Sequence, residues 1–363
     1  IGELAVFDHW RQRVTLVAVA LLGPSVAEAE IDAAYDDAVA RLDQLARDGA
    51  RPIDEPMVRP PDESEASQSA DIDALAVAES LSTGLYEKSV EAAKEYIRAG
   101  DIFQVVLSKR FSFDLDTDPI DVYRVLRQIN PSPYMYFIRR PELTLVGCSP
   151  EPLVQVQEGR VISRPIAGTR RRGRTEQHDR MMAAELAEDP KERAEHVMLV
   201  DLARNDLGRV VEYGSLSVDE MMTLERYSHV MHLTSEVSGE LTGGKTVIDV
   251  LRATLPAGTV SGAPKVRAME IIDEMEPTKR GPYSGVVGYL SFSGNLDTAI
   301  AIRTMVCGPD GASVQAGAGV VADSVPELEN KECWNKARAL LAAVGPARRM
   351  TAERRNQQIE EHS

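Results

Sequence analysis

The stretch Gln155-Val156-Gln157-Glu158-Gly159-Arg160-Val161-Ile162 has the pattern of a short β-hairpin. It runs into Arg164-Pro165-Ile166-Ala167-Gly168-Thr169-Arg170, which we expect to leave the strand edge and to turn at Gly168. A threonine hydroxyl and several guanidinium groups meet in this segment, and both kinds of group donate hydrogen bonds to carboxylates. The segment therefore suits a carboxylate-bearing ligand, although taken alone an ordinary surface turn with solvated arginines is the safer interpretation.

Similar patterns continue along the chain. Residues 134–138 and 143–148 are predicted to be paired strands, and residues 286–292 and 298–306 flank the turn signal Ser293-Gly294-Asn295. Residues 101–113 are strand-like, whereas helices are expected at 28–48, 266–275 and 85–99, the last closed by Gly100. Hairpins in this number predict an α+β fold, with largely antiparallel sheets that carry helices on their outer faces.

We expect four parts along the chain. Residues 1–47 combine two strand patterns with a helix and are interpreted as the remnant of an N-terminal subdomain. Because the chain starts at Ile1, we expect its natural N-terminal portion to be missing. Residues 48–75 form a linker or mobile loop, residues 76–345 the main domain, and residues 346–363 a polar tail that we expect to be frayed.

Composition excludes several classes of function. A formal net charge of −16 repels polyanions, so no nucleic-acid partner is expected, and an anionic small substrate would need local arginines or a metal ion. The longest apolar run, 16–23, is too short to cross a bilayer, so no membrane partner is expected. Cys148, Cys307 and Cys333 fit neither a metal-binding spacing nor a disulfide framework, which favours a cytoplasmic location.

Two predicted helices each carry glutamates three positions apart on one face. Glu192 and Glu195 belong to the first helix, and Glu329 and Glu332 to the second. Carboxylate oxygens from two helices, completed by water, are the ligands that Mg²⁺ prefers. The structural alternative is strong, because Glu192 occupies a capping-box position and Glu332 can pair with Lys336 across one turn.

Two small-residue segments can contact an anion through their backbone. Residues 315–320, Gln-Ala-Gly-Ala-Gly-Val, end a strand and form either an anion nest or a plain bend. Residues 255–265 lead into the helix at 266–275, whose N-terminus favours an anion, and Thr259 can add a hydroxyl. The segment is not a nucleotide-binding loop, because it lacks the required Gly-Lys-Ser/Thr ending.

Two single residues are further candidates. His232 can act as a general acid or base, although most histidines in apolar surroundings are only packed and hydrogen-bonded. Arg303 interrupts a strand of small and apolar residues, where a charge needs an anionic partner. Either a ligand or a structural salt bridge can supply that partner.

The sequence segments described above, taken in their order along the chain, resemble those of the chorismate-utilising enzymes, and specifically of the large subunits of anthranilate synthase. The resemblance covers roughly residues 93–344 and rests on about seven motifs. They are Asp101–Ser108, Cys148–Glu151, Pro165–Arg170, Asp201–Asp206, the two small-residue segments and the closing acidic helix. The resemblance implies two packed antiparallel sheets with helices outside and an active site in the cleft between them. Residues 76–345 would then be the chorismate-binding catalytic domain.

The resemblance also implies a role for each candidate residue. Mg²⁺ would bind the ring carboxylate of chorismate, with Glu195 and Glu332 as leading ligands and Glu192 and Glu329 acting directly or through water. The enolpyruvyl carboxylate would be held by Tyr283, Arg303 and the backbone of Gly317, Ala318 and Gly319. Thr169 and Thr259 would line the pocket, with Thr259 also a catalytic candidate. His232 and Glu151 would transfer protons at the departing hydroxyl.

The implied reaction belongs to tryptophan biosynthesis. Ammonia attacks the ring carbon next to the ring carboxylate, and hydroxide leaves as water to give 2-amino-2-deoxyisochorismate. Loss of pyruvate then produces anthranilate. Because the chain has no Cys-His-Glu amidotransferase signature, the nitrogen would come from a separate glutamine amidotransferase subunit.

Particular positions separate members of the family. Aminodeoxychorismate synthases often carry a lysine nucleophile where this chain has Ala167, and isochorismate and salicylate synthases carry a water-activating lysine near Gln104. Alanine cannot attack and glutamine is a poor base, so a free nucleophile such as ammonia is favoured over hydration. The alternatives are an aminodeoxychorismate synthase component I that lacks the lysine, and a non-catalytic protein that binds chorismate or tryptophan.

A tryptophan feedback site is also implied. Asn130, Pro131, Tyr134 and Met135 match the part of that site found in the later portion of the family sequence. The Leu-Leu-Glu-Ser segment that completes the site in full-length relatives is absent. We therefore expect tryptophan inhibition and stability to be weaker than in the full-length relatives.

Overall fold

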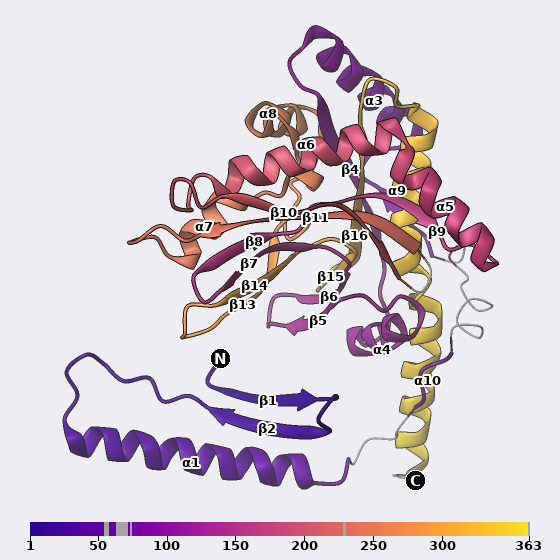
Figure 1. Cartoon of the computed structure of the whole chain (residues 1–363). Coiled ribbons are helices and arrows are strands. Elements are labelled where there is room, and N and C mark those ends of the chain that lie inside the picture. Colours follow the sequence, from indigo (N-terminus) through magenta and orange to yellow (C-terminus); the bar gives the residue numbers. More distant parts are fainter. Residues whose placement is uncertain (54–57, 63–71, 73–74, 228–229, 362–363) are drawn as a thin grey trace. The chain divides into compact units, whose positions relative to one another are not determined.

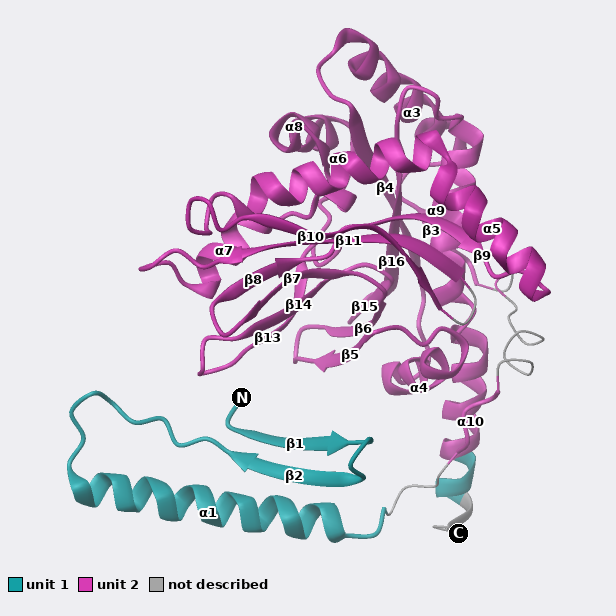
Figure 2. Cartoon of the chain, in the orientation of Figure 1, with its two compact units in different colours: residues 1–57, 356–363 teal, residues 58–355 magenta. Residues whose placement is uncertain are grey.

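The computed structural model describes residues 1–53, 58–62, 72, 75–227 and 230–361 (Figure 1). Contacts divide the chain into two compact units, residues 1–57 with 356–363 and residues 58–355 (Figure 2). Much of the predicted linker 48–75 lies outside the described residues, because positions 54–57, 63–71 and 73–74 are not described. Each unit is therefore considered by itself.

The smaller unit is a hairpin with one helix. Strand β1 (Glu3–Asp8) pairs antiparallel with β2 (Arg13–Ala18), and helix α1 (Glu28–Ala50) packs against β2. These elements confirm the two strand patterns and the helix expected near the start of the chain. A two-stranded sheet buries little surface on its own, so packing against α1 is a main source of its stability.

The larger unit contains two seven-stranded sheets, and every strand pair in them is antiparallel. The first has the order β10-β11-β8-β7-β14-β13 with β9 paired to β11. Its strands are β7 (Pro152–Gln157), β8 (Arg160–Ser163), β9 (Ile166–Arg171), β10 (Ser217–Arg226), β11 (Val230–Glu240), β13 (Val286–Leu290) and β14 (Leu296–Ile300). The hairpin predicted at 155–162 is the pair β7–β8.

The second sheet has the order β12-β4-β16-β15-β6-β5 with β3 paired to β4. Its strands are β3 (Ala78–Glu79), β4 (Gln104–Phe113), β5 (Tyr134–Arg139), β6 (Thr144–Ser149), β12 (Gly262–Ala263), β15 (Thr304–Gly308) and β16 (Gly311–Val320). Figure 1 shows the strands of both sheets within one helix-covered body. The predicted α+β fold with largely antiparallel sheets is confirmed.

Helices pack against both sheets. They are α3 (Thr83–Ala99), α4 (Pro119–Ile129), α5 (Glu176–Glu188), α6 (Pro190–Leu207), α7 (Val247–Thr254), η1 (Gly258–Val260, a 3₁₀ turn), α8 (Lys265–Met275) and α9 (Pro326–Leu341), and α10 (Val344–Glu361) follows α9 in the chain. Helix α6 contacts β9 and β11 of the first sheet, and α9 contacts β16 of the second. The two helices that carry the glutamate pairs are therefore each fixed to a different sheet.

The C-terminal segment differs from the frayed tail that its polarity suggested. Residues from Val344 onward form helix α10, and Val344, Ala347 and Met350 are buried in the core of the larger unit. Thr117 donates a hydrogen bond of 3.0 Å to the Ala347 carbonyl. Apolar residues spaced three apart thus stabilise the start of a helix that is otherwise polar.

The strand predicted at 298–306 is two strands. Residues up to Ile300 belong to β14 of the first sheet, whereas residues from Thr304 belong to β15 of the second. The chain crosses between the sheets at Ala301–Arg303, and Arg303 adopts a left-handed conformation with φ of 49°. Apart from Arg303, the small and apolar pattern continues through the crossing, so the sequence pattern alone did not separate the two strands.

The turn predicted at Gly168 is also wrong. Strand β9 continues through this position, with His232 of β11 opposite Thr169 and Leu233 opposite Ala167. Gly168 is therefore the extra residue of a β-bulge, with φ of 69°. The bulge changes the direction of the strand locally without ending it.

Candidate active site

The glutamates of α6 and α9 share one electrostatic environment. The Asp189 carboxylate caps α6 by accepting hydrogen bonds from the backbone N–H groups of Lys191 and Glu192, at 2.9 and 3.2 Å. Burial raises the pKa of Glu195, and the charges of Glu192 and Glu332 raise it further. Since Glu332 lies on α9, the two helices bring their carboxylates within electrostatic reach of each other.

Helix α9 has the same character. Burial raises the pKa of Glu329, and the neighbouring charge of Glu332 adds to this. Two of the four glutamates already have cationic partners, Glu192 with Arg170 at 3.0 Å and Glu332 with Lys336 at 2.7 Å. The structural pairing weighed for Glu332 is thus present.

Carboxylates from two helices that repel one another fit a hard divalent cation in their donor chemistry. Two features support this fit, the type of donor atom and the unbalanced negative charge. Within the described ranges, no three His, Cys, Asp or Glu side chains are already arranged as a ligand set. Binding a cation would require the carboxylates of Glu192 and Glu332 to exchange their present partners, Arg170 and Lys336.

His232 is held by the bulge in β9. Its Nδ1 lies 3.1 Å from the Gly168 carbonyl oxygen and 3.1 Å from the Thr169 hydroxyl. Since a carbonyl only accepts, Nδ1 carries a proton toward Gly168, and the neutral ring then has its lone pair on Nε2. The Tyr227 ring packs edge-on against the imidazole, with the two ring centres 5.7 Å apart. This arrangement orients Nε2 as a proton acceptor.

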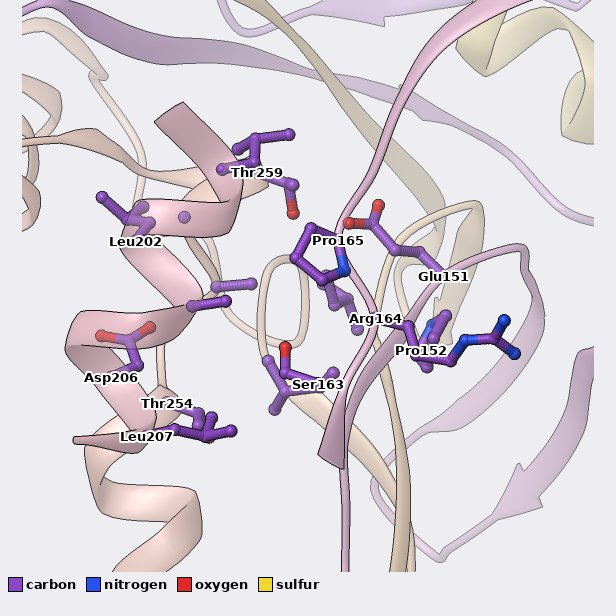
Figure 3. A pocket seen from close by; sticks show the side chains of 16 residues that line it. Glu151, Pro152, Ser163, Arg164, Pro165, Leu202, Asp206, Leu207, Thr254 and Thr259 are labelled. Carbon is purple, nitrogen blue, oxygen red and sulfur yellow. The ribbon is translucent and has the colours of Figure 1, made fainter. Parts of the chain in front are cut away.

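Glu151 and Thr259 line a cavity of about 50 Å³ between the first sheet and α6. Figure 3 shows Glu151 and Pro165 facing Leu202 and Asp206 of α6 across this space. Burial raises the pKa of Glu151 to about 7, although the Thr259 hydroxyl beside it and the more distant charges of Lys336 and Arg303 act in the opposite direction.

The Thr259 hydroxyl has an unused hydrogen-bonding capacity. Its oxygen is buried, and in the described part of the chain it has no hydrogen-bond partner of good geometry. A buried hydroxyl without a partner costs about 1–3 kcal/mol, which a bound molecule can remove. Together with the raised pKa of the Glu151 carboxyl group, this makes the cavity a candidate catalytic site.

Arg303 sits in strained backbone without a structural ion pair. Within the described residues no carboxylate lies at ion-pair distance from its guanidinium group. Ser284, which donates its backbone N–H to the Ala301 carbonyl at 3.1 Å, is also left-handed, with φ of 67°. Two non-glycine residues in this conformation side by side cost about 1–3 kcal/mol each, which is typical of functional sites.

The small residues of β16 permit a close approach. A Cβ atom on Gly317 would lie 3.0 Å from the Tyr283 hydroxyl, and one on Gly319 would lie 2.5 Å from the Gln104 side-chain nitrogen. β15 pairs with β16 only as far as Val314, so among the described residues the edge at Gly317, Ala318 and Gly319 has no partner strand on that side. Backbone N–H groups at this edge can therefore face a ligand.

The arginines beside Thr169 are engaged within the protein. Arg170 pairs with Glu185, Asp189 and Glu192, and Arg164 pairs with Glu225 and Glu236. Their charges are paired with carboxylates of the protein, which fits the ordinary surface turn weighed for this segment. Thr169 itself is exposed.

The residues expected to form a tryptophan site do not all converge. Tyr134 faces the first sheet, where its hydroxyl donates to Asp297 at 3.2 Å, and burial raises its pKa to about 12. Met135, the next residue, turns to the opposite face and packs on the core of the second sheet. Asn130 caps α4 and Pro131 is exposed.

One residue of the site had been interpreted only as a structural partner. Lys336 donates to the Gly317 carbonyl at 2.8 Å as well as to Glu332, and its charge acts on Glu151, Glu195 and Glu329. It therefore links the acidic helix α9 to the small-residue edge of β16. The spacing of Glu332 and Lys336 was visible in the sequence, but the contact with Gly317 was not.

A family model for chorismate binding enzymes matches residues 3–342. The chain therefore belongs to the chorismate-binding enzymes. Within that class it is 50% identical over 345 residues to anthranilate synthase component 1 of Acetivibrio thermocellus, which covers 95% of this chain and 68% of that protein. The component 1 of Aquifex aeolicus is 59% identical over 259 residues, 71% of this chain and 52% of that protein.

A solved structure supports the same grouping. Anthranilate synthase component I from Streptococcus pneumoniae superimposes with a TM-score of 0.80 and 41% identity, over 94% of this chain and 72% of that one. The chain thus groups with the component 1 subunits of anthranilate synthase and spans part of their length. This grouping does not favour either alternative, an aminodeoxychorismate synthase or a non-catalytic binding protein. In the described part of the chain, no helix is both long and apolar enough to span a membrane.

Proposed function

We propose that this chain is the large subunit of a Mg²⁺-dependent anthranilate synthase, a lyase that converts chorismate and ammonia to anthranilate and pyruvate. The observation that carries the proposal is a set of unmatched polar groups at one site. Glu151 has a pKa of about 7, the buried Thr259 hydroxyl has no partner of good geometry, and within the described residues Arg303 has no carboxylate partner. The similarity to component 1 proteins supports the same reaction.

Substrate binding uses the two sides of the site differently. Arg303, Tyr283 and the backbone of residues 317–319 bind the enolpyruvyl carboxylate, because they combine a free charge, a hydroxyl and an open strand edge. The glutamates of α6 and α9 would hold Mg²⁺, Glu195 and Glu332 foremost, with Glu192 and Glu329 acting directly or through water. When bound, the ion neutralises the ring carboxylate in an otherwise acidic cleft.

Proton transfer involves Glu151 and His232. Ammonia forms the new carbon–nitrogen bond beside the ring carboxylate, the ring double bonds shift, and the carbon–oxygen bond to the hydroxyl breaks. A protonated Glu151 donates to that hydroxyl, which leaves as water, and its pKa near 7 suits this role. His232 is the second candidate for proton transfer, because hydrogen bonding at Nδ1 leaves Nε2 free. Loss of pyruvate from 2-amino-2-deoxyisochorismate then aromatises the ring.

Two positions support ammonia as the nucleophile. Ala167 is buried beside Leu233 of β11 and has no nucleophilic group. Gln104 lies against Gly319 and is a poor base for activating water. The nitrogen therefore comes from free ammonia or from a glutamine amidotransferase subunit, the second component that the name component 1 implies for the relatives.

We also propose that the enzyme is inhibited by tryptophan and lies in the cytoplasm. Tryptophan is the proposed inhibitor, with Asn130, Pro131 and Met135 contributing part of its site, whereas Tyr134 faces the first sheet. The three cysteines are buried and free, which supports a reducing cytoplasm.

One assay tests the reaction. The protein is incubated with chorismate and ammonium, with and without Mg²⁺, and anthranilate is followed by its fluorescence. We expect fluorescence to increase only when Mg²⁺ is present. Consumption of chorismate without a fluorescent product would contradict the proposal.

A further inference from the structure

A second cavity, of about 200 Å³, lies beside the proposed substrate site. Strands β4, β15 and β16 and the loop at 280–283 surround it. Its lining residues are Arg110, Arg280, Gly281, Pro282, Tyr283, Thr304, Val306, Ser313 and Gln315. Of these, only Tyr283 also belongs to the proposed substrate site, so the two spaces share one wall.

Gln315 lines this cavity and carries an unsatisfied acceptor. Its residue surface is 7% exposed, and its side-chain nitrogen donates to the Ser108 hydroxyl at 2.8 Å. The other end of the amide, Oε1, is buried and has no hydrogen-bond partner among the described residues. Leaving a buried carbonyl oxygen unpaired is costly, and a bound molecule with an N–H or O–H group removes that cost.

Arg110 presents an unmatched charge to the same cavity. Its guanidinium group donates to the Lys279 carbonyl, and in the part of the chain that the structure describes no carboxylate is within ion-pair distance. Arg280 provides the contrast, because it bonds Glu276 twice and also the Val260 and Val106 carbonyls. Of these two arginines, Arg110 is thus the one that can attract an anion.

The remaining walls are apolar or weakly polar. The Tyr283 ring, Pro282 and Val306 supply carbon surface, while Thr304 and Ser313 supply hydroxyls. A cavity with a few directed polar groups among apolar walls is the usual form of a small-molecule site.

We propose that this cavity is a second ligand site, which binds a small organic carboxylate that also carries an amino or hydroxyl group. The carboxylate pairs with Arg110, and the N–H or O–H group donates to Gln315 Oε1 once that side chain turns toward the cavity. Both unmatched groups are then satisfied by one molecule.

The site is connected to the catalytic side by buried hydrogen bonds. Gln315 bonds Ser108, whose hydroxyl bonds Glu276 at 2.8 Å, and Glu276 holds Arg280 at 2.6 Å. Arg280 in turn donates to the carbonyl of Val260, the residue after Thr259, at 2.7 Å. A ligand that reorients Gln315 therefore acts on the Thr259 loop, a consequence that rests on the proposed function.

Calorimetric titration with two matched probes tests the site. 2-Aminobenzoate and benzoate differ only in the amino group, so we expect 2-aminobenzoate to bind about fivefold more tightly. Gln315→Met should remove this preference, and Arg110→Gln should weaken both probes about tenfold. 2-Aminobenzoate is also the product of the reaction proposed above, so a control variant in the substrate site is needed to separate the two sites.

A matched control distinguishes this cavity from the substrate site. Arg303→Gln should leave the affinity for 2-aminobenzoate unchanged. If Arg303→Gln weakens binding and Arg110→Gln does not, the probe occupies the substrate site and the proposal is overturned. Should Arg110→Gln lower the thermal midpoint, Val306→Trp, which fills the cavity and keeps every charge, must abolish binding, and unchanged binding in that variant overturns the proposal.

Discussion

The proton held by Glu151 makes the stability of this protein depend on pH in a predictable way. Its pKa is raised from the ordinary value of 4.5 to about 7, first by burial. At about 1.36 kcal/mol per pH unit, this difference corresponds to about 3 kcal/mol. Part of the residue remains in contact with solvent, so we reduce the expected effect to about 2 kcal/mol.

The direction follows from proton binding. Between pH 4.5 and about 7 the folded protein retains the Glu151 proton, whereas the unfolded chain has lost it. This contribution to stability is complete below pH 4.5 and is lost as the pH rises through about 7. Glu151→Gln has no such proton, so its stability relative to the wild type should rise by about 2 kcal/mol from pH 4 to pH 8.

Urea unfolding of both proteins at pH 4 and pH 8 measures the effect, and the difference between them cancels the other titrating groups. The exposed Glu142→Gln serves as a matched control and should show no such change. If the free-energy difference between wild type and Glu151→Gln is the same at both pH values, Glu151 ionises as an ordinary carboxyl. The assignment of Glu151 as proton donor would then fail.

Three substitutions test other parts of the site. Glu332→Gln should abolish Mg²⁺-dependent anthranilate formation without changing the thermal midpoint of unfolding. Glu327→Gln, which changes an exposed residue of the same helix, should retain activity. Equal activity in the two variants would remove the metal assignment. Ala167→Lys should impair ammonia addition by occupying the nucleophile's path, measured as initial rates at several ammonium concentrations, and normal rates would count against that geometry. Gly168→Ala should lower stability by about 1–3 kcal/mol in urea unfolding, since φ is 69° and the new methyl lies 2.8 Å from the Leu186 side chain; an unchanged midpoint would argue against the bulge.

Local sequence patterns correctly predicted the elements whose backbone depends only on nearby residues. The helix closed by Gly100 ends there, with Gly100 in the left-handed conformation at φ of 83°. Asp189, directly before Pro190, caps α6, and the strand at residues 155–157 pairs with that at 160–162. In each case a few neighbouring residues fix the backbone, so the sequence alone is sufficient.

The errors concern features that depend on distant parts of the chain. The crossing at Ala301–Arg303 can be recognised only once both sheets are known, because Ala301 and Ile302 are as apolar as the strands on either side. The bulge at Gly168 is defined only by its partner, His232. The charge state of the site also depends on long-range contacts, since Arg170 is neutralised by residues 15 to 22 positions away.

The contacts of Lys336 show the same limit. Its i, i+4 pairing with Glu332 is a local rule, but its hydrogen bond to Gly317 spans 19 residues and joins α9 to β16. Likewise, nothing local marks Gln315 as carrying an unpaired carbonyl oxygen. Such features are visible only when the full hydrogen-bond network is known.

The central claim is that ammonia nitrogen is placed on the chorismate ring. Incubation with chorismate, Mg²⁺ and ¹⁵N-ammonium, followed by mass spectrometry, measures this directly. We predict anthranilate carrying one ¹⁵N atom, together with an equal amount of pyruvate. A hydroxylated product without ¹⁵N, or an aminated product that retains its enolpyruvyl group, would contradict the account.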